Sequence, residues 1–187
     1  MEKEDRNLIE KAQQGNISAF EELVQKYDRR ILSLAYQFTR NTEDAKDIYQ
    51  EVLMRVYNKL NRFRFESNFY TWLYRIVVNC AINYLKRRTR HSHQSIDEIN
   101  ERQGWDWVTL DTGPTPETLA ISTEIREKIH ATIETLPLMQ KVIFILRFLE
   151  DFKIKDIAQI IGRSEGTVKN QLFRSTEKMR ESLASYL

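Results

Sequence analysis

Apolar residues recur at three- and four-residue spacing along most of the chain, and no convincing alternation with a period of two is present. Glycine and proline interrupt this pattern sparsely, and neither residue occurs between Gly15 and Gly104. Such a stretch predicts consecutive helices rather than strands. The expected fold class is therefore all-α, with N-caps at Ser18 and Thr42 and helices over about 5–14, 18–39, 43–60, 68–88, 117–135, 138–150, 154–161 and 165–184.

The helical pattern stops between about residues 89 and 116, where the sequence is polar, lacks a period and ends in Gly-Pro-Thr-Pro. Because a structureless segment of this length is unusual inside one compact domain, it predicts a flexible linker between two small helical domains. The expected boundaries are 1–90 for the first domain, 91–116 for the linker and 117–187 for the second domain. Trp105 and Trp107 lie in this linker, and their indoles either hold it against a domain or contact a partner.

Composition narrows the class of protein. The 187 residues are 41% apolar and 30% charged, which is typical of a globular protein in water. No apolar run approaches the roughly 20 residues that cross a bilayer, so we expect a cytoplasmic protein without membrane insertion. A single cysteine, Cys80, excludes an internal disulfide and argues against structural zinc. Because the net charge is only +2, affinity for nucleic acid would depend on where the charges lie.

The predicted helix over residues 68–88 has two different faces. Its apolar face, expected to pack into the core, carries Phe69, Leu73, Ile76, Val77, Cys80, Ala81 and Tyr84. Its second face carries a ring, amides and cations at spacings of 3, 4, 4 and 3, namely Trp72, Arg75, Asn79, Asn83 and Lys86.

This second face has the chemistry of a nucleic-acid surface. Aromatic rings stack on unpaired bases, amides hydrogen-bond base edges, and Arg or Lys contacts phosphate. No Asp or Glu occurs from Ser67 through Ile96, so the local field is positive. The alternative is that the aromatic residues belong to the core and the basic end complements the helix dipole.

Two further segments carry chemical signals. The helix over about 43–60 has a charged row, Asp44, Asp47, Glu51 and Arg55, which by itself is typical of a solvated face. Near the carboxyl end, a short amphipathic helix, the turn Gly162-Arg163-Ser164 and a longer helix form a helix-turn-helix pattern. In the longer helix, we expect Val168, Leu172, Ser175 and Met179 to point inward, and Asn170, Phe173, Arg174 and Glu177 to point outward.

Three motifs in this order resemble the extracytoplasmic-function group of bacterial sigma factors, in the sigma-70 family. They are DAKDIYQEVLMRVY (44–57), FYTWLYRIVVNCAINYL (69–85) and IKDIAQIIGRSEGTVKNQLFRSTEKMRESL (154–183), and the resemblance covers essentially the whole chain. It implies a promoter-specificity subunit of RNA polymerase with two helical domains, sigma-2 and sigma-4, the latter with the helix-turn-helix. The implied partners are core polymerase, through its beta-prime coiled coil and beta flap, promoter DNA as duplex and melted non-template strand, and an anti-sigma factor.

The resemblance also implies roles for particular residues. Those implied to contact the minus-10 element, where a flipped base is captured, are Phe65, Glu66, Ser67, Asn68, Tyr70, Trp72, Arg75, Asn79, Asn83, Lys86, Arg87 and Arg88. Those implied to contact the minus-35 duplex are Arg163, Thr167, Lys169, Asn170, Phe173, Arg174 and Lys178, with Asn170 and Arg174 on base edges and Lys169 and Lys178 on phosphate. Those implied to dock on the beta-prime coiled coil are Asp44, Asp47, Gln50, Glu51 and Arg55.

The chain departs from the family pattern at four of these motif positions. Glu165 stands where many relatives have a small apolar residue, and Gln171 stands where they have a basic one. Phe65 and Glu66 also differ from the commonest relatives. The preferred minus-35 sequence and minus-10 base therefore stay open.

Three other classes of protein share some of these features. A regulator that binds only duplex DNA would share the helix-turn-helix, but such proteins normally carry an α/β receiver domain. An enzyme would need a reactive site, yet His91 and His93 have no carboxylate or thiolate at ligand spacing and Cys80 lies on the predicted core face. We therefore expect no enzymatic activity, no metal and no cofactor. A helical adaptor that binds only protein would leave the acid-free segment unexplained.

Overall fold

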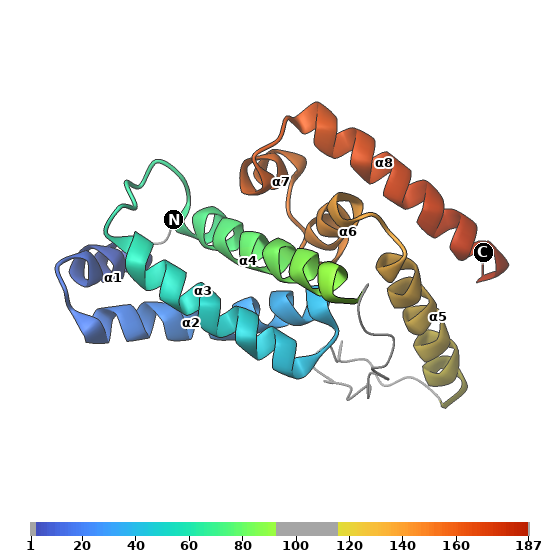
Figure 1. Ribbon diagram of the computed structural model, residues 1–187, viewed down its shortest axis with the longest axis horizontal. Helices are drawn as coiled ribbons and strands as arrows, with labels where there is room; N and C mark the ends of the chain where they lie inside the picture. The colour runs from blue at the N-terminus through green and yellow to red at the C-terminus, as the bar shows by residue number, and fades with distance from the viewer. Residues whose placement is uncertain (1–2, 93–115, 187) are drawn as a thin grey trace. The chain divides into compact units, whose positions relative to one another are not determined.

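The computed structural model describes residues 3–92 and 116–186, and all regular structure within these ranges is helical (Figure 1). Helices α1 (Lys3–Gln13), α2 (Ile17–Thr39), α3 (Thr42–Leu60) and α4 (Phe69–Ser92) form one compact unit. Helices α5 (Pro116–Glu134), α6 (Leu138–Phe144) and α8 (Glu165–Ser182) form the other, with most of α7 (Ile154–Ile161). The prediction of an all-α fold with two helical domains is confirmed. Trp105, Trp107 and His93 lie outside the described residues.

The N-caps of α2 and α3 are asparagines, so the prediction of Ser18 and Thr42 was wrong. The side-chain oxygen of Asn16 accepts a hydrogen bond from the Ala19 amide at 3.0 Å. That of Asn41 accepts from the amides of Glu43 and Asp44 at 2.9 and 3.0 Å. Asn16 and Asn41 have extended backbone, whereas Ser18 and Thr42 already lie inside the helices. An N-cap needs the extended conformation to direct its oxygen at the amides of the first turn.

Two helices differ in extent from the prediction. α4 continues to Ser92 instead of ending near residue 88, because its last turn contains neither Gly nor Pro to stop it. α6 passes into a π-helical turn (Ile145–Leu149), in which the Glu150 amide donates to the Ile145 carbonyl at 3.1 Å. A short 3-10 turn (Ala184–Tyr186) follows α8.

The core of the amino-terminal unit forms where α4 packs on α2 and α3. The predicted apolar face of α4 is buried, except that Tyr84 is only half-buried. The residues of α2 and α3 buried in this core include Leu23, Ile31, Leu34, Ile48 and Val52. Burial of each large aliphatic side chain contributes roughly 1.5–3 kcal/mol, so the core fixes the rotation of α4 and thereby which residues face outward.

In the carboxyl-terminal unit, α8 packs on α5 and α6. Val168, Ser175 and Met179 are buried and Leu172 is half-buried, as the helical spacing predicts. No helix within residues 3–92 and 116–186 combines the length and the apolar character that a bilayer-spanning segment requires.

Lys141 is a buried cation in α6 whose ammonium donates to both carboxylate oxygens of Glu134, each at 2.8 Å. Because Glu134→Ala leaves this buried charge without its carboxylate, we expect the free energy of unfolding to fall by about 1–3 kcal/mol. Urea unfolding of the full chain, followed by circular dichroism, measures the loss. Glu127→Ala, an exposed change in the same helix, should have little effect, and equal losses in the two variants would contradict this role.

Candidate nucleic-acid interface

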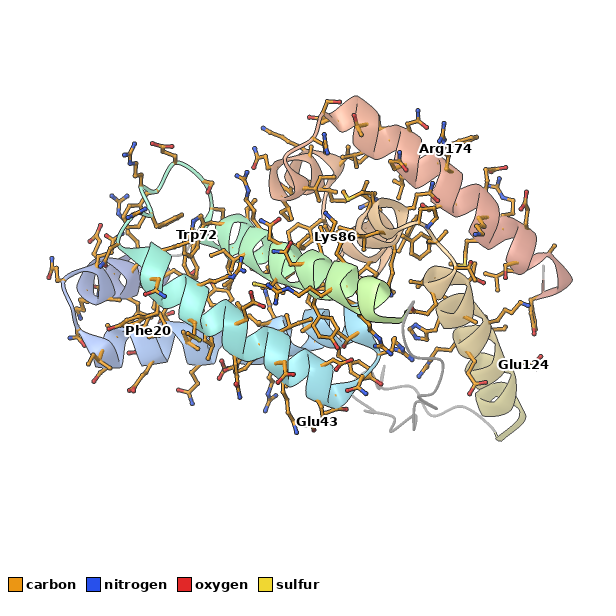
Figure 2. The ribbon with its side chains drawn as sticks, in the orientation of Figure 1. Phe20, Glu43, Trp72, Lys86, Glu124 and Arg174 are labelled. Carbon is orange, nitrogen blue, oxygen red and sulfur yellow. The ribbon has the colours of Figure 1, made fainter. Side chains whose placement is uncertain are left out.

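The polar stripe of α4 lies at the surface of the amino-terminal unit. Arg75, Asn79 and Lys86 are exposed, whereas Trp72 and Asn83 are half-buried. Figure 2 shows Trp72 near the start of α4 and Lys86 toward its end. Arg75, Asn79 and Lys86 therefore lie outside the core, whereas Trp72 also packs on the buried rings of Phe63 and Phe69. Contact of the stripe with DNA stays a prediction.

Trp72 is held by neighbouring aromatic rings while part of its indole stays accessible. Its ring centroid lies 5.2 Å from that of Phe63 and 5.5 Å from that of Phe69. Phe63 is buried and also contacts the rings of Phe65 and Phe69, at 5.1 and 5.7 Å. Aromatic pairs of this geometry fix ring orientation. Trp72 is therefore held in a fixed orientation and is half-exposed, and stacking of a base on its ring stays a prediction.

Tyr70 does not share this stripe. Its ring lies 4.3 Å from Tyr74 and 6.3 Å from Tyr27, with the Arg30 guanidinium 5.5 Å from the ring centroid. Residues two apart on a helix are separated by about 200°, so Tyr70 and Trp72 face different sides of α4. Contact of both residues with the same strand stays a prediction.

The loop between α3 and α4, residues 61–68, carries the predicted base-capture residues. Glu66, Ser67 and Asn68 are exposed, and the Asn68 side-chain oxygen accepts a hydrogen bond from the Tyr70 amide at 3.2 Å. Phe65 is half-buried and has φ of 59°, a left-handed conformation that favours glycine. Such a conformation costs a residue with a side chain about 1–3 kcal/mol, and it persists only where surrounding contacts hold it.

The charged row of α3 is partly occupied by contacts within the unit. Asp47 and Gln50 are exposed, whereas Asp44, Glu51 and Arg55 are half-buried. Arg55 pairs with Glu51 at 2.5 Å. Asp47 and Gln50 therefore offer the most accessible groups of this row to a protein partner.

Asp44 and Arg88 link the charged row of α3 to the basic end of α4. The Arg88 guanidinium lies 3.2 Å from the Asp44 carboxylate. Burial raises the pKa of Tyr84 above its ordinary value, and a hydrogen bond to Asp44 and the negative charge of that carboxylate add to the effect. Arg87, the neighbour of Arg88, is exposed. Sequence reasoning assigned Asp44 and Arg88 to separate partners and missed that they pair.

The outward face of α8 is accessible as predicted at Asn170, Phe173 and Arg174, whereas Glu177 is half-buried. Gly162, at φ of 65°, lies between α7 and α8, and the Ser164 hydroxyl oxygen caps α8 by accepting from the Thr167 amide at 3.1 Å. Phe173 is 66% exposed, an unusual state for so large an apolar ring. The other exposed members are Arg163, Thr167, Lys169, Asn170 and Arg174, the last of which is labelled on α8 in Figure 2.

Two side chains of this region, those of Lys178 and Thr167, have contacts that the sequence did not indicate. The Lys178 ammonium donates to the Thr135 carbonyl at 2.9 Å, which joins α8 to the end of α5. Thr167 lies beside the cap, with its hydroxyl 2.9 Å from that of Ser164. Glu165 is exposed in the first turn of α8, where the helix dipole favours a negative charge. Phosphate contact by Lys178 stays a prediction, beside this structural role.

Of the three residues considered as a metal set, Cys80, His91 and His93, only Cys80 has a described side chain. No group of three or more His, Cys, Asp or Glu side chains that could hold a metal lies among the described residues. Cys80 is buried, and burial raises the pKa of its thiol to about 11, so the thiol is neutral at physiological pH. His91 lies in the last turn of α4, and its side chain is outside the described ones.

One unit with a ring, amides and cations along an outward helix face, and a second with a helix-turn-helix, define a two-domain helical DNA-binding protein. The family model for Sigma-70 region 2 matches residues 23–91, and that for Sigma-70, region 4 matches residues 126–179. The RNA polymerase sigma-H factor of Pseudomonas aeruginosa is 34% identical over 187 residues, which cover 100% of this chain and 97% of that protein. The ECF RNA polymerase sigma-E factor of Escherichia coli K12 is 36% identical over 174 residues, which cover 92% of this chain and 91% of that protein.

The chain belongs to the extracytoplasmic-function group of the sigma-70 family, whose members are transcription-initiation factors that bind DNA. A solved structure also resembles it, that of the sigma factor RpoE in complex with the anti-sigma factor NepR from Bartonella quintana. The TM-score is 0.67 with 21% identity, and the match covers 88% of this chain and 96% of that one. At this level of identity the likeness concerns the fold.

Proposed function

We propose that this sigma factor directs core RNA polymerase to promoters by recognising a minus-35 duplex and a minus-10 element, and that it holds the minus-10 bases as the strands separate. The outward stripe of α4 carries this proposal, because it places Trp72, Arg75 and Asn79 on one exposed face with no acidic residue nearby in sequence. Duplex DNA buries its base faces, so a stacking platform is useful only for bases that have left the helix.

In this mechanism, the DNA strands separate because the protein binds unpaired minus-10 bases more tightly than paired ones. A base pair that opens loses stacking and pairing energy of a few kcal/mol, and capture of the extruded base offsets part of that loss. Trp72 stacks on an unpaired base, Asn79 and Asn83 hydrogen-bond base edges, and Arg75, Lys86 and Arg87 neutralise phosphates. Sequence recognition and strand opening thereby become one event.

The carboxyl-terminal unit reads the duplex through α8. Arg174 suits the acceptor atoms of guanine, and Asn170 suits the edge of adenine in the major groove. The exposed ring of Phe173 suits the methyl group of thymine. Lys169 and Arg163 supply phosphate contacts that hold α8 in register.

Asp47 and Gln50 are the exposed centre of the surface that we propose for docking on the beta-prime coiled coil, and the second unit would contact the beta flap. An anti-sigma factor that masks these surfaces would control the protein. Control by an anti-sigma factor is supported by the complex that the structurally similar sigma factor RpoE forms with the anti-sigma factor NepR. Because core polymerase is the proposed partner, we also propose that the protein acts in the cytoplasm.

Asp47→Ala is expected to weaken binding of core polymerase about tenfold, which corresponds to about 1.4 kcal/mol, because an exposed charge at a docking surface is lost. A fluorescence titration of the full chain with core polymerase measures this affinity. Glu22→Ala removes an equal charge from the exposed surface of α2 and should leave the affinity unchanged. If binding of a single-stranded minus-10 oligonucleotide fell as much as polymerase binding in Asp47→Ala, the division of surfaces would be wrong.

Run-off transcription with core polymerase on a promoter library tests the proposed function as a whole. We expect transcripts from a subset of promoters that share two sequence elements. Binding to duplex DNA without any start site would support the duplex-binding regulator instead.

A further inference from the structure

We propose that helix α1 positions the base-capture loop, residues 61–68, and that Arg6 and Gln13 set the shape in which this loop meets an extruded base. The inference rests on the proposed function. α1 precedes the part of the chain that matches Sigma-70 region 2, residues 23–91. In the structure α1 nevertheless contacts the beginning and the middle of this loop region, and it reaches the end of the loop indirectly through Tyr27.

At the beginning of the loop, Gln13 caps the end of α3. Its side-chain nitrogen donates to the carbonyls of Leu60 and Phe63, both at 2.9 Å. The Leu60 carbonyl, at the end of α3, also accepts from the Phe63 amide at 2.9 Å, and Phe63 lies in the loop, so one amide nitrogen with two protons ties the helix end to the loop. The two bonds fix the direction in which the chain leaves α3.

In the middle of the loop, Arg6 holds Phe65. The Arg6 guanidinium lies 4.9 Å from the centroid of the Phe65 ring, and the Arg6 Nε donates to Glu10 at 2.9 Å, which orients it. The Phe65 ring also packs on the buried ring of Phe63, and the two ring centroids lie 5.1 Å apart. Since the backbone of Phe65 is in the left-handed region, contacts to its ring are what retain this conformation.

At the end of the loop, α1 acts through Tyr27. Asp5 is only 3% exposed and accepts hydrogen bonds from the Tyr27 hydroxyl and the Lys26 ammonium, each at 2.7 Å. The Tyr27 ring lies 5.5 Å from that of Phe69, the first residue of α4. The loop is therefore anchored to α1 directly by Gln13 and Arg6, and indirectly at its end by Asp5 through Tyr27.

The consequence concerns binding of an unpaired base. A loop that is already in its binding shape loses less conformational entropy when it takes up a ligand. Arg6 and Gln13 do not need to touch DNA for this effect, so they are positioning residues. Their removal frees the loop while the Trp72 platform and the α8 surface stay in place.

The test uses the full chain and a single-stranded oligonucleotide with the minus-10 non-template sequence of a promoter that it transcribes. 2-Aminopurine replaces each base in turn, so that its fluorescence reports capture at one position. We expect Arg6→Ala and Gln13→Ala to weaken binding about five- to tenfold and to lose the signal at the captured position, with Arg6→Lys recovering part of it. Binding of minus-35 duplex should not change.

Matched controls are available nearby, because Lys11→Ala removes an equal charge from an exposed position of α1 and Gln14→Ala removes an equal amide from the exposed turn that follows it. Arg6 is 58% exposed, so Arg6→Ala retains the fold and decides the question if Gln13→Ala unfolds. Strand binding by Arg6→Ala equal to that of Lys11→Ala, with Trp72→Ala impaired, overturns the inference and leaves the proposed function standing. Failure of the unaltered protein to bind the strand overturns the proposed function itself.

Discussion

Trp72→Ala is expected to reduce promoter opening about 10- to 100-fold, while binding of core polymerase stays the same. The stacking of one base on an aromatic ring contributes about 1–3 kcal/mol, and this contribution exists only after the base leaves the duplex. Trp72 is the half-exposed ring of the α4 stripe, and Phe63 and Phe69 hold it in place. Permanganate reactivity of unpaired thymines in the complex with polymerase measures opening.

Because Trp72 also contacts Phe63 and Phe69, its loss affects packing, and the conservative variant Trp72→Phe separates the two roles. Trp72→Phe keeps a ring and should recover most of the opening. Asn79→Ala, at an exposed position with no packing role, should impair opening in the same direction. If polymerase binding fell in parallel with opening in Asn79→Ala, the proposed role of the stripe would be refuted.

Arg174→Ala is expected to lower affinity for the minus-35 duplex by about 1–3 kcal/mol and to relax the preference at one base pair. Arg174 is exposed on α8, next to Asn170 and Phe173 on the same face. Lys169→Ala should instead weaken all sequences alike and reduce the slope of log affinity against log salt by about 0.9, as expected for one phosphate contact. Competition binding with single-base variants of the duplex distinguishes the two patterns.

Arg180→Ala serves as the charge-matched control for Arg174→Ala. Arg180 lies on α8 and pairs with Glu177 at 2.5 Å. It is six residues from Arg174, about 240° around the helix, so it faces another side. If the two variants lost equal affinity for the duplex, only the total charge would matter. That result would contradict the proposal that the outward face of α8 reads base edges directly.

Helical periodicity is the part of the structure that the sequence predicted well. The buried faces of α4 and α8 follow from apolar spacing, because a helix that packs on one side must place those residues toward the core. Once these faces are fixed, the outward positions of Arg75, Asn79 and Arg174 follow from the same 100° rotation.

Contacts between distant parts of the chain could not be predicted in this way. The pair between Asp44 and Arg88, the bond from Lys178 to Thr135 and the bonds from Gln13 to the end of α3 each join residues more than 40 positions apart. A local pattern holds no information on which polar groups meet after the helices pack. The left-handed conformation of Phe65 is similarly set by its neighbours, since the residue type alone argues against it.

Photocrosslinking in the initiation complex tests the central claim most directly. Single bases of the minus-10 non-template strand are replaced by 5-iodouracil, and the crosslinked residue of the sigma factor is identified by mass spectrometry. The account predicts crosslinks to α4 at Trp72 that form with open promoter complexes and not with closed duplex. Crosslinks of equal yield to closed duplex, or none to α4 in open complexes, would contradict it.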